Sequence, residues 1–416
     1  MRILYVSQYF PPEMGAPAAR VHELSRAWVR SGHTVTVLTG FAHHPTGVKA
    51  RGDRWRLTRR QTVDGIDVVR TYVYAAPNLG TWRRMASYVS FFASAALIGA
   101  FRVSRPDIVV ATSPQLLCAC AGYALARVKR VPFVFEVRDL WPESIIAVEA
   151  MQENLIVRGL KRVARYLYRN SSRIVTVGQG YKRQIEQRYS ISPQRIEVVP
   201  NGVDLATFVP GPRDNEVRRE YGWDDRLVLL YVGTHGMAHA LHVVLEAARR
   251  FRDDPRKLFV FVGEGACKAQ LKRRAAELQL DNVQFIDQQP KVRIPLFYSA
   301  CDIGLVTLRN TPLFQDVLPS KIFEYLGMQR PVIISVDGEA RRLVQEAGSG
   351  IFVAPENVDE LVDAIRRLAE QPALRESMGR SGRQYVAAHY RRDRLAELYL
   401  ELLQRICDAP SAGIGG

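Results

Sequence analysis

The feature that most constrains the fold is an alternation of short apolar runs with amphipathic stretches. Apolar runs of strand length recur through the first half at residues 2–7, 33–39, 66–70, 107–112, 132–137 and 173–177. Between the first two lies a helical stretch, 18–31, with Val21, Leu24 and Trp28 on one face and Gly32 at its end. Runs of this kind are typical of strands buried on both faces, and the intervening helices imply parallel crossovers.

The second half repeats this pattern, with helical stretches at 241–251 and 267–278. Its apolar runs occupy residues 227–233, 258–263, 283–286, 303–306 and 331–335. A polar joint containing Pro and Gly, 208–213, separates the halves. The sequence therefore predicts an α/β protein of two doubly wound, Rossmann-like domains with a cleft between them, because ligands bind beyond the carboxyl ends of such strands. We expect domains at 1–205 and 206–385, and a C-terminal segment, 386–416, whose helix crosses back to the first domain before a tail.

Composition narrows the class of protein. A chain of 416 residues that is 47% hydrophobic and 24% charged has the make-up of a folded protein rather than a disordered one. The start of the sequence reads as a strand and lacks the pattern of a signal peptide. The five cysteines form no Cys-x-x-Cys pair, which argues against a disulfide framework or a zinc site and fits a reducing cytoplasm.

Positive charge is concentrated in one half of the chain. Residues 1–205 hold 29 Lys and Arg against 14 Asp and Glu, whereas residues 206–416 hold 29 against 28. Such a field attracts nucleic acid or an anionic membrane surface, although it also fits a merely solubilising surface. No RRM, helix-turn-helix or zinc-finger pattern accompanies the charge, so we expect no nucleic-acid partner.

Several short motifs point to phosphate and sugar chemistry. Gly15 precedes a predicted helix, whose first N–H groups can hold an anion. The loop is not Gly-x-Gly-x-x-Gly, and the chain has no P-loop, which excludes ordinary nicotinamide enzymes and P-loop kinases. The segment Gly263-Glu264-Gly265 is a weaker signal of phosphate binding, because it also fits a plain turn between a strand and a helix. Asp316 and Glu324 flank Lys321, so that two acids could hold sugar hydroxyls and one cation could hold phosphate.

Together the motifs carry a resemblance over about residues 1–405. The chain resembles retaining family 4 glycosyltransferases of the GT-B fold. The residues that carry this resemblance are Ile-Leu-Tyr-Val-Ser at 3–7 with Gly15, Pro-Asn-Gly-Val-Asp at 200–204, Val-Gly-Glu-Gly at 262–265, Ala-Cys-Asp at 300–302, Pro-Ser-Lys-Ile-Phe-Glu at 319–324 and Arg-Pro-Val-Ile at 330–333. Segments at 7–13, 39–47 and 138–143 are similar to bacterial L-fucosamine-type transferases of O-antigen and capsule assembly.

The resemblance implies roles for the second half of the chain in binding a nucleotide-sugar donor. Glu324 would accept hydrogen bonds from the ribose hydroxyls, Asp316 would lie near the transferred sugar, and Lys321 would face the diphosphate. Asp316 is one methylene shorter than the Glu usual in the family. The donor-binding residues implied are Gly15, Thr234, His235, Gly236, Gly263, Glu264, Asp316, Pro319, Ser320, Lys321 and Glu324.

The chain departs from the family at two positions where cationic side chains usually bind the diphosphate. Thr234 and His239 stand where many members carry Arg and Lys, so Lys321, the Gly236 backbone and Arg138 must neutralise the leaving group. His235, His239 and His242 are spaced like metal ligands, but cations and dipoles serve this fold instead. We therefore expect no metal and no cofactor.

The acceptor side is expected in the first domain, after the run at 132–137. Asp139 could orient or deprotonate an acceptor hydroxyl, or it could cap the helix that follows. We expect Asp139, Arg138 and Lys321 to be catalytic, and His43, His44 and Glu143 to contact the acceptor. The family resemblance assigns no carboxylate nucleophile.

An uncharged segment, 85–101, has basic residues on both sides. At about 1.5 Å per residue a helix here would be shorter than a hydrocarbon core of about 30 Å. It could lie in a membrane interface, with Phe91 and Phe92 inserted, or it could be a crossover helix buried on the sheet. The basic first domain favours the membrane. The subfamily resemblance implies an undecaprenyl-diphosphate-linked acceptor and a peripheral location on the inner face of the bacterial cytoplasmic membrane.

Two other functions fit the same fold. A nucleotide-sugar 2-epimerase would need no lipid acceptor, which leaves the apolar and basic first domain unexplained. A non-catalytic, membrane-associated binding protein would account for the missing Arg and Lys.

Overall fold

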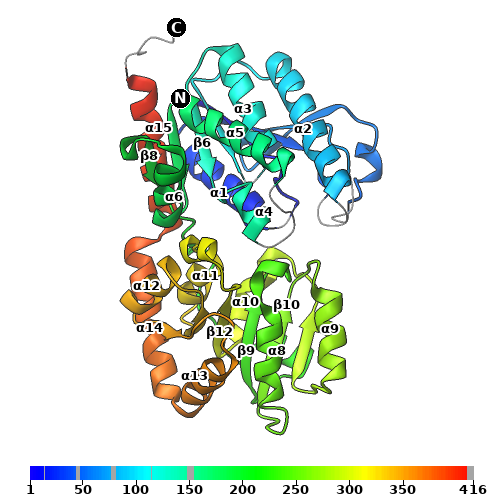
Figure 1. Cartoon of the computed structure of the whole chain (residues 1–416), viewed down its shortest axis with the longest axis vertical. Coiled ribbons are helices and arrows are strands. Elements are labelled where there is room, and N and C mark those ends of the chain that lie inside the picture. The colour runs from blue at the N-terminus through cyan, green and yellow to red at the C-terminus, as the bar shows by residue number, and fades with distance from the viewer. Residues whose placement is uncertain (14, 44–46, 76–80, 114, 148–153, 410–416) are drawn as a thin grey trace. The chain divides into compact units, whose positions relative to one another are not determined.

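The computed structural model describes residues 1–13, 15–43, 47–75, 81–113, 115–147 and 154–409. It divides the chain into two compact units, Met1–Pro200 with Asp393–Gly416, and Asn201–Arg392 (Figure 1). These limits lie a few residues from those expected at 205 and 385, because α14 (Pro372–His389) still belongs to the second unit and the chain returns only at Arg392. Both units are the Rossmann-like domains that the alternating pattern predicts.

The N-terminal unit has an eight-stranded sheet in the order β3-β4-β2-β1-β5-β6-β7-β8, in which only the β3–β4 pair is antiparallel. The strands are β1 (Arg2–Val6), β2 (Thr34–Gly40), β3 (Thr58–Val63), β4 (Ile66–Thr71), β5 (Ile108–Thr112), β6 (Phe133–Val137), β7 (Arg173–Thr176) and β8 (Ile196–Val198). The sequence pattern did not predict β3 and β8. Both lie at sheet edges, where β3 carries polar side chains and β8 is only three residues long, so neither forms an apolar run.

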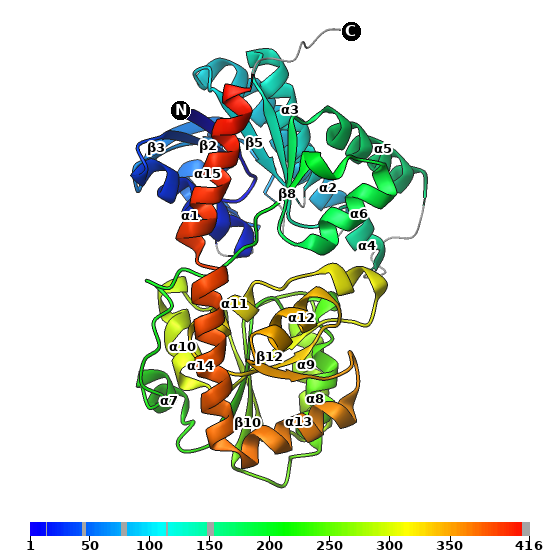
Figure 2. The same cartoon turned by 90° about the vertical axis from the view of Figure 1, so that its left-hand side faces the viewer.

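Helices cover both faces of this sheet. On one face α1 (Ala16–Arg30) packs with α15 (Arg392–Asp408), the helix that joins the N-terminal unit from the end of the chain (Figure 2). Trp28, on α1, holds α15 in place. The Nε1–H of Trp28 donates to the Ala396 carbonyl at 3.0 Å, and the Trp28 ring packs edge-to-face against Tyr399. On the other face α3 (Leu116–Lys129) contacts both α2 (Thr81–Arg102) and α5 (Leu155–Asn170). The remaining helices are α4 (Glu143–Ala147) and α6 (Gln179–Tyr189).

The C-terminal unit has a six-stranded parallel sheet in the order β11-β10-β9-β12-β13-β14. The strands are β9 (Leu227–Val232), β10 (Lys257–Val262), β11 (Val283–Ile286), β12 (Ile303–Thr307), β13 (Val332–Ser335) and β14 (Gly350–Phe352). Its helices are α7 (Glu216–Tyr221), α8 (Leu241–Arg249), α9 (Lys268–Glu277), α10 (Ile294–Ala300), α11 (Lys321–Gly327), α12 (Glu339–Glu346), α13 (Val358–Glu370) and α14.

The core of this unit lies where α8, α9 and α13 pack on one face of the sheet. The strand order reverses between β9 and β12, which makes their carboxyl ends the place where such sheets bind ligands.

Candidate donor and acceptor sites

Two glycine loops pack directly on each other at the carboxyl ends of β9 and β10. A Cβ on Gly263, whose φ is +143°, would lie 2.0 Å from the Gly233 carbonyl oxygen, and one on Gly265 would lie 2.4 Å from that of His235. The His235 N–H donates to the Glu264 carbonyl at 2.8 Å and completes the contact. The glycines are therefore required by backbone packing, a stronger constraint than a plain turn.

Lys321, at the start of α11, places a cation against these loops. Its Nζ lies 3.5 Å from the centre of the Tyr231 ring, and a Cβ on Gly233 would come within 3.1 Å of it. The ammonium group is buried, and no described residue accepts a hydrogen bond from it. Burial lowers the pKa of Lys321 to about 7, although the nearby Glu324 carboxylate opposes the shift. An unpaired buried amine of this kind is typical of a site that awaits an anion.

Two histidines surround the same tyrosine. The rings of His235 and His239 lie 5.9 and 6.1 Å from that of Tyr231. Both nitrogens of His235 and the Nδ1 of His239 are buried and form no hydrogen bond of normal geometry with any described residue. Burial and the charge of Lys268 lower the pKa of His235 to about 4, while burial and Lys321 lower that of His239 to about 3.

Glu324 lies one turn beyond Lys321 and is held by a tyrosine that sequence reasoning missed. The buried Tyr298 hydroxyl, on α10, donates to Glu324 Oε2 at 2.7 Å. Burial, followed by the Glu324 charge, raises the pKa of Tyr298, so the hydroxyl stays a donor. Asp316 ends the 3-10 turn Pro312–Asp316, and Pro319 and Ser320 accept the first backbone hydrogen bonds of the turn into α11.

The other predicted donor residues have different surroundings. Lys268 Nζ forms ion pairs with the carboxylates of Glu264 and Asp287, each at 2.6 Å. Because Asp287 directly follows β11, Lys268 links the Glu264 loop to the end of that strand. Thr234 is exposed, and its backbone carbonyl accepts a hydrogen bond from the Tyr231 hydroxyl at 2.8 Å. Among the described residues, no group of three or more His, Cys, Asp or Glu side chains is placed to hold a metal ion.

In the N-terminal unit the residues after β6 form a second candidate site. Ser113 Oγ, after β5, accepts the Arg138 N–H at 2.8 Å and the Asp139 N–H at 3.4 Å. Within the described chain the Nε and Nη1 of Arg138 are buried without partners, and burial lowers its pKa despite the charge of Glu136. Burial raises the pKa of Asp139, while the neighbouring Ser144 side chain and Leu140 N–H oppose that shift. The proximity of these two groups near the start of α4 keeps the capping interpretation open alongside the catalytic one.

The three residues expected to contact the acceptor are placed differently. Glu143, at the start of α4, accepts the Tyr189 hydroxyl at 2.6 Å, and its other oxygen is buried without a described partner. The His43 ring is buried, with Nδ1 2.9 Å from the Phe41 carbonyl and 3.5 Å from Glu13. His44 lies outside the described residues. Gly15 precedes α1 with a φ of +130°.

A buried ion pair beneath this second site was not predicted. Glu136, on β6, accepts from Arg20 Nε at 3.2 Å and from the hydroxyls of Tyr5 and Thr112, both at 2.9 Å. Arg20 also donates to the carbonyls of Val199 and Pro200. A glutamate inside the apolar run Phe-Val-Phe-Glu-Val was the available signal, because a charge buried in a strand requires a partner.

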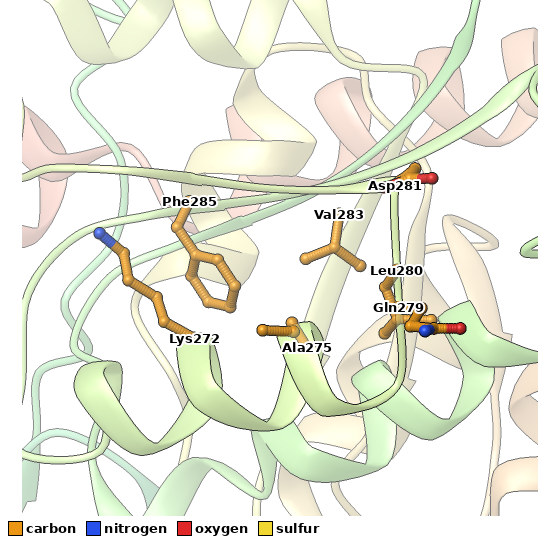
Figure 3. Close-up of a pocket in the computed structure, with 8 residues that line it drawn as sticks. Lys272, Ala275, Gln279, Leu280, Asp281, Val283 and Phe285 are labelled. Carbon is orange, nitrogen blue, oxygen red and sulfur yellow. The ribbon is translucent and has the colours of Figure 1, made fainter.

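Two hollows of the C-terminal unit involve α9. One of about 510 Å³ is formed by α9 and β11, where Figure 3 shows Lys272 and Phe285 at one end and Asp281 at the other. A second, of about 610 Å³, opens between α8 and α9 beside Gly236. The first is lined by none of the predicted donor residues, and the second includes Gly236. The candidate donor site therefore rests on the unpaired cation and the glycine loops.

Two protein families match the chain, one over each half. Residues 18–207 match the family described as Glycosyltransferase Family 4, and residues 213–385 match Glycosyl transferases group 1. The putative colanic acid biosynthesis glycosyl transferase WcaI of Escherichia coli (strain K12) is 25% identical over 378 residues, which are 88% of this chain and 92% of that protein.

Solved structures show the same fold. Sucrose-phosphate synthase from Thermosynechococcus elongatus superposes with a TM-score of 0.80 at 17% identity, over 98% of this chain and all of the other. HepE of Anabaena, solved in complex with UDP-glucose, gives 0.74 at 16% identity, over 97% of this chain and all of HepE. At these identities the likeness concerns the fold alone.

Proposed function

Because this chain is a glycosyltransferase of the GT-B fold, of the group 1 and family 4 type, we propose that it transfers a sugar with retention from a nucleotide diphosphate to a lipid-linked saccharide. The donor would be UDP-N-acetyl-L-fucosamine or a similar nucleotide sugar, and the acceptor an undecaprenyl-diphosphate-linked saccharide of a cell-surface polysaccharide. The observation that carries the proposal is the buried, unpaired Lys321 ammonium beside two interlocked glycine loops.

The donor half of the reaction follows from that site. As the sugar leaves, negative charge develops on the diphosphate, and a cation already desolvated beside it stabilises that charge strongly. Gly233 brings its backbone against Lys321, because a Cβ there would come within 3.1 Å of the ammonium nitrogen. Glu324, oriented by Tyr298, offers a carboxylate to the ribose hydroxyls. Asp316 would approach the transferred sugar.

The acceptor half is assigned to the N-terminal unit. Arg138 supplies a buried guanidinium with unpaired nitrogens, which suits an anionic or hydroxyl-rich group. Asp139 is the candidate for orienting the acceptor hydroxyl, and Glu143 and His43 are candidates for contacting its sugar. The relation to WcaI, whose name refers to colanic acid, supports an acceptor from surface polysaccharide synthesis.

A transfer assay tests the proposal directly. Purified protein is incubated with UDP-, GDP- and dTDP-sugars, with and without a synthetic lipid-diphosphate saccharide. We expect release of nucleotide diphosphate that depends on the acceptor, and a product whose anomeric configuration matches the donor by NMR. Epimerised nucleotide sugar formed without acceptor would contradict transferase activity, and binding without any turnover would identify a non-catalytic protein.

The Glu324 assignment predicts a specific loss of nucleotide affinity. Glu324→Gln replaces one acceptor oxygen by a donor, so ribose contacts weaken and the Kd for UDP or GDP should rise about tenfold, the scale of one lost hydrogen bond to a charged group. Tyr298→Phe, which only releases the carboxylate, should raise it by a smaller factor. Calorimetric titration measures both. An unchanged Kd in Glu324→Gln for every nucleotide would remove Glu324 from the site.

The surface that would contact a membrane lies on α2. One stripe of this helix, including Phe91, Ala95 and Gly99, is buried, whereas Trp82 and Phe101 are 80% and 81% exposed. By length and composition Met85–Arg102 could cross a membrane, but the buried Phe91 stripe packs as a domain helix does. The expectation that Phe91 inserts into lipid is therefore wrong, and the outer stripe is the surface available to it.

A basic helix accompanies this apolar stripe. Exposed arginines recur on α5 at helical spacing, at Arg158, Arg162, Arg165 and Arg169, and Leu155 beside them is 81% exposed. Helices α2, α3 and α5 lie side by side on one face of the sheet (Figure 1). Apolar groups flanked by arginines suit an anionic bilayer surface, so we propose peripheral binding to the inner face of the cytoplasmic membrane.

Vesicle sedimentation tests this surface. Binding of the wild type should rise with the anionic lipid fraction and fall with salt, because exposed charges are screened within about 10 Å at 0.1 M. Trp82→Ser with Phe101→Ser should weaken the binding that survives high salt several-fold without lowering Tm, because both side chains are exposed. Val209→Ser, at an exposed position of the other unit, is the control. Wild-type binding that is indifferent to lipid charge would contradict the membrane location.

A further inference from the structure

Besides Lys321, the candidate donor site contains His239, whose buried Nδ1 also has no hydrogen-bond partner among the described residues. His239 ends the 3-10 turn Met237–His239, directly after the Gly233–Gly236 loop, and its main chain is held from two sides. Its N–H donates to the Gly236 carbonyl at 3.1 Å, and its carbonyl accepts the Thr307 hydroxyl of β12 at 2.6 Å. The imidazole is thereby held at the switch point between β9 and β12.

The groups facing this imidazole are mostly cationic or neutral. Lys321 and His235 face it from α11 and from the loop after β9, and Tyr231 presents its ring from β9. Arg309, after β12, bonds the neighbouring Ala238 carbonyl through its N–H. On α11 the Glu324 carboxylate acts on Lys321 and is held by Tyr298. No carboxylate in the described chain forms an ion pair with His239, whereas the exposed His242 has Glu356 at 3.8 Å.

A histidine in these surroundings is neutral while the site is empty. Burial and the Lys321 charge both disfavour the imidazolium, which explains a pKa of about 3. A diphosphate beside Lys321 would oppose both causes, because two negative charges at short range favour the charged ring. The neutral imidazole has one N–H donor, whereas the protonated ring has two and a positive charge.

Resting on the proposed donor site, we propose that His239 is the second cation of that site, neutral in the free protein and protonated when the donor diphosphate binds beside Lys321. His239 thus takes up a proton from solvent when the ligand binds, and the empty site does not hold two repelling cations in a buried place. Donor affinity then carries a pH dependence that a permanent cation would not give.

The direction and window of this dependence can be worked out. A group whose pKa rises on binding takes up a proton, so affinity falls as pH increases towards the pKa of the complex. Lys321 gives the same sign, but with a pKa of about 7 it is mostly charged at pH 6.5 in the free protein and contributes only a small part of the change below that pH. Between pH 5 and 6.5 the dependence therefore comes mainly from the histidines, and the His239→Gln variant separates His239 from His235.

The test measures Kd for UDP-glucose, GDP-mannose and dTDP-glucose calorimetrically at pH 5, 5.75 and 6.5, in buffers of different ionisation enthalpy. These diphosphate diesters keep a constant charge across the window. For the wild type we expect Kd to rise at least fivefold with pH and proton uptake to accompany binding. His239→Gln should bind more weakly at pH 5 with a flat profile, and His239→Lys should bind tightly with a flat profile. His242→Gln, an exposed neighbour, should match the wild type.

Each other outcome is decisive. A flat wild-type profile, or a wild-type slope in His239→Gln, overturns the protonation of His239 and leaves the donor site standing. Binding of none of the three nucleotides at any pH would overturn the proposed function itself. If His239→Gln does not fold, NMR titration of the His239 Cε1–H in wild-type protein decides: the ring should be neutral at pH 5 without nucleotide and charged with it.

Discussion

Replacement of Lys321 by alanine should lower kcat/KM for sugar transfer at least about 30-fold, which corresponds to a loss of about 2 kcal/mol of transition-state stabilisation. The reason is the position of the amine: its Nζ is buried over the Tyr231 ring, and no described group accepts a hydrogen bond from it. A ligand that brings negative charge is the partner that this group lacks. Steady-state kinetics with a saturating acceptor measures the effect.

A stability measurement distinguishes this role from a structural one. Lys321→Met keeps most of the side-chain volume and removes an unsatisfied buried amine, so Tm should stay level or rise while activity falls as in the alanine variant. Lys272→Ala, at an exposed position of α9, controls for loss of positive charge in the same unit. A kcat/KM near wild type in Lys321→Ala would show that the diphosphate rests elsewhere, and a large drop in Tm in Lys321→Met would indicate a packing role.

Much of the fold could be predicted because each buried parallel strand is visible in the sequence as a short apolar run. The runs that became β1, β5, β9 and β10 are apolar along almost their whole length, and this occurs where helices cover both faces of a sheet. The edges carry no such signal. The polar β3 is stabilised by its antiparallel pairing with β4, and β14 has only three residues, so both depend on neighbours that periodicity does not reveal.

The candidate donor site was predicted in its outline but not in its support. Lys321, Glu324 and the glycine loops could be found because their spacing in the chain is itself the motif. Tyr298 and Tyr231 could not, since each contacts its partner from an element that is distant in the sequence. His239 was interpreted as the loss of a cation, because sequence gives the residue type and not the charges that surround it.

Arg20→Met is expected to have the largest effect on folding. It leaves the Glu136 carboxylate in a fully buried position without its ion pair, and removal of one partner of such a pair typically costs about 3–5 kcal/mol. Burial alone would lower the pKa of Arg20, yet the charge and hydrogen bond of Glu136, together with Tyr5 and Tyr399, outweigh the burial and raise that pKa. Thermal unfolding should show a Tm lowered by about 10 °C. Hydrogen exchange should place the loss of protection in peptides from α1 and β6.

Matched variants separate the buried pair from positive charge in general. Arg60→Met breaks an ion pair with Asp67 in which the arginine is 62% exposed, and it should cost less than about 1 kcal/mol. Arg20→Met combined with Glu136→Gln should recover part of the loss, because no buried charge then remains without a partner. Because Glu136 lies two residues before Arg138, the single variant should also impair transfer while donor affinity, which belongs to the other unit, stays near wild type. If Arg20→Met melts like the wild type, the pair does not stabilise the sheet beneath the acceptor site.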